Sequence, residues 1–159
     1  GRGANALKLA KQGWSVLGID WAETAIKLAT EAAEQSGLNA RFIVHDAKNW
    51  ISPLAFDLVI ITYALPGAED NRAMLQTAVS ALASGGTLLV VEWDRSIAEK
   101  WGLSTSDFFS PASIVAMLPG MDVEKAEVKY VSDMFSGPDD PRWYGAPEAK
   151  LALVQVKKP

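Results

Sequence analysis

Short apolar runs alternate with amphipathic patterns along the first part of this chain, and this alternation is the feature that most constrains its fold. The runs, rich in Val, Ile and Leu and weakest in the second case, occupy residues 15–20, 40–45, 56–62 and 87–93. Such runs are typical of strands buried on both faces of a parallel sheet. Helical patterns fill the intervals, at residues 4–12, 23–35 and 71–83. The alternation predicts an α/β fold with a doubly wound, mostly parallel sheet and helices on both faces.

The pattern changes after residue 93. Residues 94–109 have mixed polarity and no clear period, whereas Ser110 and Pro111 have the character of an N-cap and the first residue of a helix. Residues 123–131 alternate apolar and charged side chains, as a half-exposed strand does, and residues 150–157 form the last apolar run. Because only a loop joins these two strands, they pair antiparallel if they are neighbours. We therefore expect a reversed C-terminal hairpin within a single domain, residues 1–159.

The composition removes several classes of protein. The chain has no cysteine, which excludes a disulfide framework and a cysteine-based zinc site. Its formal net charge of −4 argues against a nucleic-acid partner, because binding to phosphate backbones needs a basic face. The longest apolar runs have about six residues, far fewer than the roughly 20 that cross a bilayer. Since no charged and apolar leader is present, we expect a cytoplasmic location.

Residues that follow the apolar runs are the candidates for ligand binding, since open α/β sheets bind ligands beyond the carboxyl ends of their strands. Asp20 and Asp46 end two of the runs, with no Lys or Arg beside either one. Carboxylates in such positions suit a ligand that offers hydroxyl or amino donors. Gly1 and Gly3 precede the first helix, where a glycine loop lets a ligand approach the exposed N–H groups of a helix N-terminus.

Several segments together resemble a known family. They read GRGANA at 1–6, LAKQGW at 9–14, VLGIDWAETAI at 16–26, VHDA at 44–47, FDLVI at 56–60 and SGGTLL at 84–89. This set looks like the motifs of class I S-adenosylmethionine-dependent methyltransferases, and it is similar to small bacterial members of the tellurite-resistance or thiopurine type. The resemblance implies a Rossmann-like fold, methyltransferase activity and S-adenosylmethionine as the cofactor.

The resemblance also implies which residues hold the cofactor: Gly1, Gly3, Asp20, Trp21, Ala22, Asp46, Ala47, Ile61, Thr62 and Tyr63. The two glycines would face its methionine part, and Asp20 would bind the ribose hydroxyls. Asp46 would take the adenine amino group with the Ala47 amide nearby, while the pair after Asp20 would lie against the adenine. Residues 61–63 would border the methionine part and the methyl-accepting pocket. We assign no metal ligand and no catalytic side chain.

Some of these residues also fit structural roles. Asp20 and Glu23 have the spacing of a helix capping box, and Asp46 could merely cap a short turn. His45, the only histidine, stands at a strand end without a paired acid, so we interpret it as structural rather than catalytic. Three late tryptophans could line a substrate pocket or pack in a core: Trp93, Trp101 and Trp143.

More than one function is compatible with these residues. Residues 62–66 read TYALP where a DNA amino-methyltransferase would carry an Asn/Asp-Pro-Pro-Tyr-like motif. With the acidic charge, this favours a small-molecule acceptor over nucleic acid or a membrane, and the lack of an acid–histidine pair favours an acceptor that is already nucleophilic. Gly1, Gly3, Ala6 and Asp20 also satisfy the fingerprint of an NAD-dependent oxidoreductase. A non-catalytic Rossmann-like binding module is a third possibility. We expect a monomer or a homodimer.

The glycine loop opens the sequence with no apolar run ahead of it. In the family's strand order, 3-2-1-4-5-7-6, the first strand is central and lies between those at 15–20 and 56–62. Without it these two strands would be about 10 Å apart, twice the usual spacing, with unpaired backbone groups between them. We therefore expect a first strand before Gly1, which this sequence lacks.

Overall fold

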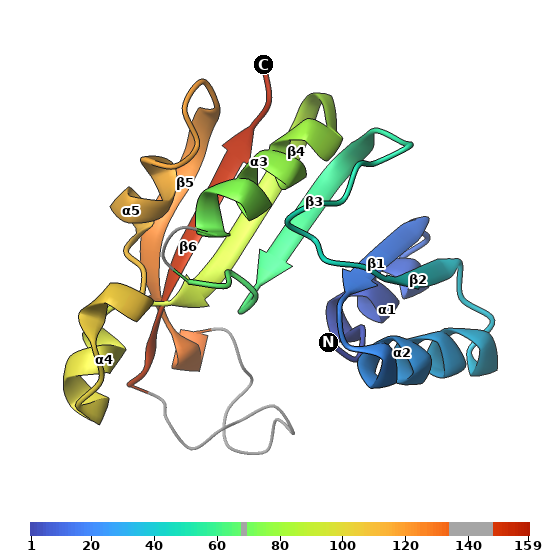
Figure 1. Ribbon diagram of the computed structural model, residues 1–159, viewed down its shortest axis with the longest axis horizontal. Helices are drawn as coiled ribbons and strands as arrows, with labels where there is room; N and C mark the ends of the chain where they lie inside the picture. The colour runs from blue at the N-terminus through green and yellow to red at the C-terminus, as the bar shows by residue number, and fades with distance from the viewer. Residues whose placement is uncertain (68–69, 134–147) are drawn as a thin grey trace. The chain divides into compact units, whose positions relative to one another are not determined.

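The computed structural model describes residues 1–67, 70–133 and 148–159 (Figure 1). Internal contacts divide the chain into two units, residues 1–50 and residues 51–159. Each unit has its own sheet and its own helices.

The first unit is built on a pair of parallel strands. Strands β1 (Val16–Asp20) and β2 (Ala40–Val44) pair over their full length, with Gly18 opposite Phe42. Both strands were expected from their apolar runs, and the expectation is confirmed. Their carboxyl ends meet at the same edge, where the His45 amide donates to the Asp20 carbonyl at 3.0 Å.

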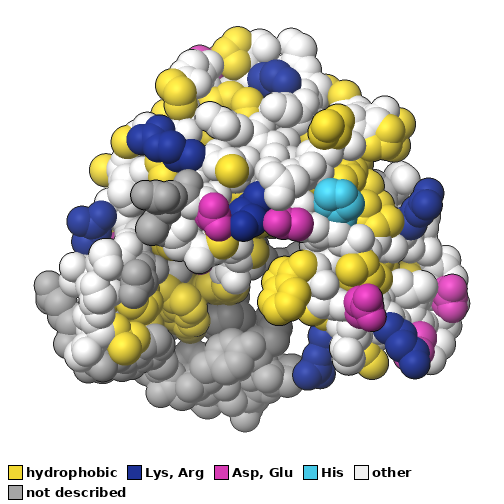
Figure 2. Space-filling view, in the orientation of Figure 1, with side chains coloured by type: hydrophobic (Ala, Val, Ile, Leu, Met, Phe, Trp, Pro, Cys, Tyr) yellow, Lys and Arg dark blue, Asp and Glu magenta, His cyan; other side chains and the backbone are white. Residues whose placement is uncertain are grey.

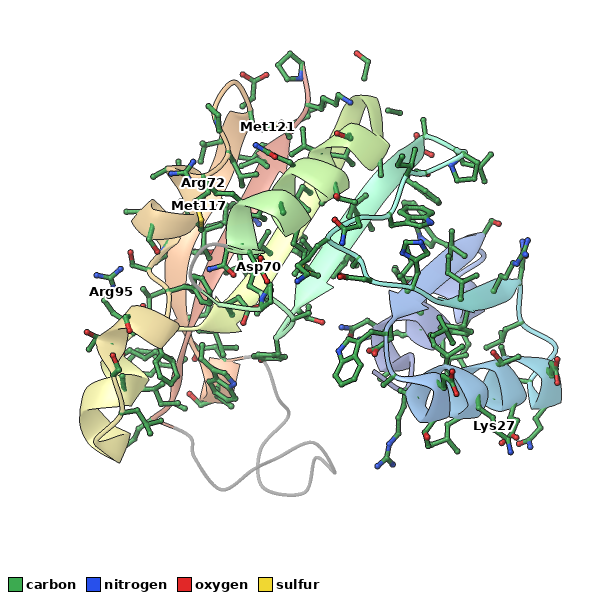
Figure 3. All side chains as sticks on the ribbon, viewed as in Figure 1. Lys27, Asp70, Arg72, Arg95, Met117 and Met121 are labelled. Atoms are coloured by element: carbon green, nitrogen blue, oxygen red, sulfur yellow. The ribbon has the colours of Figure 1, made fainter. Side chains whose placement is uncertain are left out.

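Two helices pack on this pair of strands. Helices α1 (Ala4–Lys11) and α2 (Glu23–Gln35) carry a narrow apolar stripe, and the buried residues on it are Ala10, Ile26, Ala29 and Ala33. Most of these are alanines, so the helices can approach the sheet closely. The outer face of α2 is charged: Lys27, labelled in Figure 3, lies 3.9 Å from Glu31 one turn later.

The ring of Phe42 lies against two glycines of this unit. A Cβ added to Gly18 would lie 2.5 Å from the ring, and one added to Gly3 would lie 2.9 Å from it. Gly3 also has a φ of +77°, in the left-handed region that favours glycine. Both the backbone and the neighbouring ring therefore require a glycine immediately before α1.

Four strands form the sheet of the second unit, in the order β3–β4–β6–β5. They are β3 (Phe56–Thr62), β4 (Leu82–Trp93), β5 (Asp122–Tyr130) and β6 (Lys150–Lys157). Strands β3 and β4 are parallel, whereas β6 is antiparallel to both of its neighbours. The expected reversed C-terminal hairpin is thus confirmed.

Helices cover both faces of this sheet. Helices α3 (Asp70–Ala81) and α5 (Pro111–Val115) lie over one face (Figure 1). The larger core is on this face and contains Ile61, Leu75, Leu88, Val90, Ile114, Ala152 and Val154, with Met117 and Met121 packed against it (Figure 3). On the opposite face, Val91 and Leu151 form a smaller core with Ile97 of helix α4 (Ser96–Trp101). Successive residues of a strand point to opposite faces, which separates the two cores.

Two elements differ from the sequence expectation. Helix α4 was not expected, because residues 94–109 lack a period; the Asp94 carboxylate begins it by accepting from the Ser96 amide at 3.0 Å. The helix expected over 71–83 ends at Ala81, because β4 begins already at Leu82, which pairs with Phe56. The remaining elements are two 3-10 turns, η1 (Thr105–Asp107) and η2 (Val131–Asp133). The helix expected at Ser110 and Pro111 is confirmed as α5, with Ser110 as its N-cap.

Strands β1 and β3 belong to separate sheets in the described structure. They are the strands expected to flank a further, central strand. Their observed neighbours, β2 for β1 and β4 for β3, are those of the expected strand order. The presence of a strand ahead of Gly1 remains a prediction.

Candidate functional site

In the first unit, the glycine loop and the acid after β1 lie together. The Gly1 amino group contacts Oδ2 of Asp20, and a Cβ added to Gly1 would meet nothing within 4 Å. The loop is therefore open on the side of Gly1. The Asp20 side chain and the start of α1 lie beside each other, as the glycine-loop interpretation requires.

Asp20 also fixes the backbone that leads into α2. Its Oδ1 accepts a hydrogen bond from the Ala22 amide at 2.8 Å. Ala22 is the N-cap of α2, and no side chain caps that helix, so the alternative capping box of Asp20 with Glu23 is not formed. Trp21, which lies between Asp20 and Ala22 in the sequence, is 80% exposed. A large aromatic side chain that stays this exposed suits stacking against a flat ligand.

Asp46 caps a short turn, which is the structural role that the sequence analysis gave as its alternative. Its two carboxylate oxygens accept from the Lys48 amide at 3.0 Å and from the Asn49 side chain at 3.2 Å, which closes a turn after β2. The Lys48 ammonium lies 3.8 Å from Oδ2, so a cation is close to this acid although none stands next to it in the sequence. Asp46 lies beside the end of β1, because the amide of the preceding residue, His45, donates to the Asp20 carbonyl. Ala47 lies within the same turn.

His45 contacts a carbonyl group and not a carboxylate. Its Nδ1 lies 2.9 Å from the Asp46 carbonyl oxygen, and its side chain is on the surface, where Figure 2 shows the histidine in cyan. A histidine that acts as a base usually has an acid to orient it. The surroundings of His45 in the described residues agree with its interpretation as non-catalytic.

In the second unit, the predicted residues are the last two of β3 and the one that follows it, and they differ in exposure. Ile61 lies in the larger core, Thr62 is half-buried, and Tyr63 is 48% exposed. Tyr63 has a φ of +51°, a left-handed conformation that is unusual for a bulky residue. Its ring lies 5.2 Å from that of Trp93 at the end of β4, with 38° between the planes. An aromatic pair therefore marks the carboxyl ends of β3 and β4.

Glu92 is a functional candidate to which the sequence analysis assigned no role. It lies in β4, is only 5% exposed, and its Oε1 accepts from the amides of Ala64 at 2.8 Å and Leu65 at 2.9 Å. Burial raises the pKa of the Glu92 carboxyl, although the hydrogen bonds from the Leu65 and Ala64 amides act in the opposite direction. The sequence signal was available: an acid inside a run of buried apolar residues needs a partner.

The late tryptophans cannot all be placed. Trp93 pairs with Tyr63 and packs against the smaller core. The side chain of Trp101 and the whole of Trp143 lie outside the described part of the chain.

Comparison with known proteins identifies the family. Residues 1–86, which include the glycine loop and both acids, match the family model described as a methyltransferase domain. The chain belongs to this family. It is a class I S-adenosylmethionine-dependent methyltransferase domain, and S-adenosylmethionine is its methyl donor. A tellurite-resistance or thiopurine subtype remains a prediction.

Individual relatives agree on the family and differ in acceptor. The demethylmenaquinone methyltransferase of Thermus thermophilus is 29% identical over an alignment of 161 positions, which covers 97% of this chain and 68% of that protein. The tRNA 5-carboxymethoxyuridine methyltransferase of Escherichia coli is 36% identical over an alignment of 92 positions, which covers 55% of this chain and 35% of that protein. A SAM-dependent methyltransferase structure from Methanosarcina mazei shares the fold, with a TM-score of 0.77 at 20% identity over 99% of this chain and 88% of that one.

The described ranges contain neither a helix suited to a membrane nor a cluster of metal ligands. No helix there has the length and apolar character needed to span a bilayer. No three His, Cys, Asp or Glu side chains there come together in a way that could hold a metal ion.

The residues around Asp20 fit the methyl donor chemically. Ribose hydroxyls are donors, and a carboxylate at a strand end is an acceptor for them. The open side of Gly1 leaves room for a ligand to approach the backbone, and the exposed Trp21 offers an aromatic face.

Proposed function

We propose that this chain transfers the methyl group of S-adenosylmethionine to a small, flat organic acceptor. The observation that carries the proposal is the glycine loop lying against the Asp20 carboxylate at the carboxyl end of β1. Family membership supplies the reaction, and the second unit supplies the argument for the acceptor.

In this proposal the first unit binds the nucleoside part of the donor. Asp20 accepts hydrogen bonds from the ribose hydroxyls, and its existing bond to the Ala22 amide holds the carboxylate in place. Trp21 and Ala22 lie along the adenine. Asp46 and the Ala47 amide recognise the adenine edge, with the turn formed by Lys48 and Asn49 fixing the carboxylate. Gly1 and Gly3 leave space for the methionine part.

Tyr63 is the proposed acceptor-side residue of the second unit. Its exposed ring is supported by Trp93, so together they present an aromatic surface where β3 and β4 end. Such a surface favours an aromatic or quinoid acceptor over a charged polymer. Ile61 lies in the larger core and Thr62 is half-buried, so Tyr63 is the exposed member of this group.

The chain needs to orient its ligands and exclude water more than to move protons. The donor supplies a methyl carbon bound to a sulfonium sulfur; the acceptor's electron pair forms the new bond while the C–S pair stays on sulfur. His45 has no carboxylate partner in the described residues to orient it as a base. This favours an acceptor that is already an anion or that carries a free lone pair, because such an acceptor needs no base.

Transfer RNA is the second candidate acceptor, because one relative methylates tRNA. The net charge of −4 disfavours it, since polynucleotide binding depends on neutralising phosphates with basic side chains. Small molecules are therefore the preferred class.

The experiment is a transfer assay with methyl-labelled S-adenosylmethionine and two probes, demethylmenaquinol and unfractionated tRNA. We expect label in the extracted quinol and none in the tRNA. Tyr63→Ala should reduce quinol labelling, whereas Tyr130→Ala, an exposed tyrosine on β5, should not. Label in tRNA alone would overturn the acceptor class. Binding of S-adenosylhomocysteine without labelling of either probe would instead favour a non-catalytic binding module.

A further inference from the structure

We propose that Glu92 is a positioning residue, which holds the loop at residues 63–65 in the one conformation that presents Tyr63 to the acceptor. The proposal rests on the acceptor-side role given to Tyr63 above. It assigns Glu92 no contact with donor or acceptor, and its effect passes entirely through the loop.

Three consecutive amides of this loop are bound by two successive residues of β4. The Tyr63 amide donates to the Val91 carbonyl at 2.9 Å, and the next two, of Ala64 and Leu65, donate to Glu92 Oε1. A loop with three adjacent amides held in this way has little freedom to change its backbone angles. The path of the chain after β3 is thus determined by β4.

The next residue of β4 holds the side chain. The ring centroids of Trp93 and Tyr63 are 5.2 Å apart, so the backbone of Tyr63 is bound by Val91 and its ring is supported by Trp93, two residues later on the same strand. Tyr63 itself has a φ of +51°, in the left-handed region that is energetically unfavourable for a tyrosine. An unfavourable conformation persists only where the surroundings impose it. The two hydrogen bonds that Glu92 accepts from the following amides, those of Ala64 and Leu65, are the contacts that impose it here.

Burial of a carboxylate at this position of β4 costs desolvation free energy. An apolar side chain would avoid desolvating a charge, and the neighbours of Glu92 along β4 are Val90, Val91 and Trp93. What an apolar side chain lacks is an acceptor for two amides at once. Glu92 supplies one with a single oxygen, and this points to the loop conformation as the property that the acid serves.

Asp94 provides a matched control. It lies two residues later in the chain, is 6% exposed, and also accepts two hydrogen bonds through one oxygen, from the amide and hydroxyl of Ser96. Its partners begin α4 and do not belong to the loop after β3. Loss of Asp94 therefore reproduces the loss of a buried acid without releasing Tyr63.

The experiment compares Glu92→Leu, Glu92→Gln and Asp94→Asn in the full chain with S-adenosylhomocysteine present. Amide hydrogen exchange at Ala64 and Leu65 should be at least about tenfold faster in Glu92→Leu, intermediate in Glu92→Gln, and unchanged in Asp94→Asn. In separate turnover assays, with S-adenosylmethionine in place of S-adenosylhomocysteine, the KM for demethylmenaquinol should rise at least about tenfold in Glu92→Leu and be partly restored in Glu92→Gln. The affinity for S-adenosylhomocysteine, measured by calorimetry, should stay within about twofold.

Unchanged exchange at Ala64 and Leu65 in Glu92→Leu would overturn the proposal. So would a KM unaffected by faster exchange, because the loop would then not govern the acceptor. If Glu92→Leu does not fold, the intermediate exchange expected of Glu92→Gln decides. If the parent chain does not methylate demethylmenaquinol, the proposed acceptor fails, and faster exchange in Glu92→Leu but not Asp94→Asn still supports the positioning role.

Discussion

Replacement of Gly18 by alanine tests the packing that shapes the glycine loop. Gly18 faces Phe42 across the parallel pair, and an added Cβ would lie 2.5 Å and 2.7 Å from two ring atoms. The ring cannot move freely, because it also lies against Gly3. Overpacking of this kind costs about 1–3 kcal/mol.

A smaller effect acts in the opposite direction. Gly18 does not have a positive φ, so alanine at this position also restricts the unfolded chain and recovers about 0.4–1 kcal/mol. The net loss in the free energy of unfolding should therefore be about 1–2 kcal/mol. Urea unfolding followed by circular dichroism measures it, as a midpoint shift of about 0.5–1 M for an m value of about 2 kcal/mol/M.

A double-mutant cycle with Phe42→Ala isolates the contact. Without the ring, Gly18→Ala should be neutral or slightly stabilising, since only the effect on the unfolded chain remains. Gly13→Ala is the control for strain without a clash, because Gly13 has a φ of +94° and open space around it. An equal loss for Gly18→Ala with and without the Phe42 ring would refute this reasoning.

Three further predictions concern the acids and one lysine. Asp20→Ala should weaken S-adenosylhomocysteine binding by about 1–3 kcal/mol, or about 5- to 150-fold, in calorimetry; equal binding would remove Asp20 from the site. Lys158→Met should lower the free energy of unfolding by about 1–2 kcal/mol in urea titrations, because the Lys158 ammonium donates to the Val79 and Leu82 carbonyls at the end of α3; the same loss for the exposed Lys157→Met would contradict this role. Because burial raises the pKa of Glu92, the folded state holds the proton more tightly, and the stability this provides is lost as pH rises through the raised pKa. Glu92→Gln should remove that decline in urea titrations between pH 4 and 8; a decline of the same size in both proteins would exclude Glu92 as its source.

The order of the strands and of most helices could be predicted because these elements have a local signal. The apolar runs at β1 to β4 and the helical stripes at α1 and α2 are visible in short windows, and Ser110 with Pro111 marks the start of α5. Helix α4 gave no such signal. It begins through the contact between Asp94 and Ser96, and its buried residues among the described side chains, Ile97 and Ala98, are adjacent and do not make a helical period.

The acids Asp20 and Asp46 of the candidate site were found from their place after apolar runs, but the contacts that they make could not be predicted from the sequence. The motifs implied different roles for Asp20 and Asp46, but they did not show that Asp20 contacts the glycine loop while Asp46 closes its own turn. The role of Glu92 depends on residues 64 and 65, which reach it only because β3 and β4 pair. Contacts between segments distant in sequence need the register of the sheet.

The central claim is that the glycine loop and Asp20 bind the methyl donor. Isothermal titration of the chain with S-adenosylhomocysteine and, separately, with NAD tests it most directly. Binding of one S-adenosylhomocysteine per chain, with no heat from NAD, is the predicted result. Binding of NAD, or a folded chain that binds neither ligand, would contradict the account.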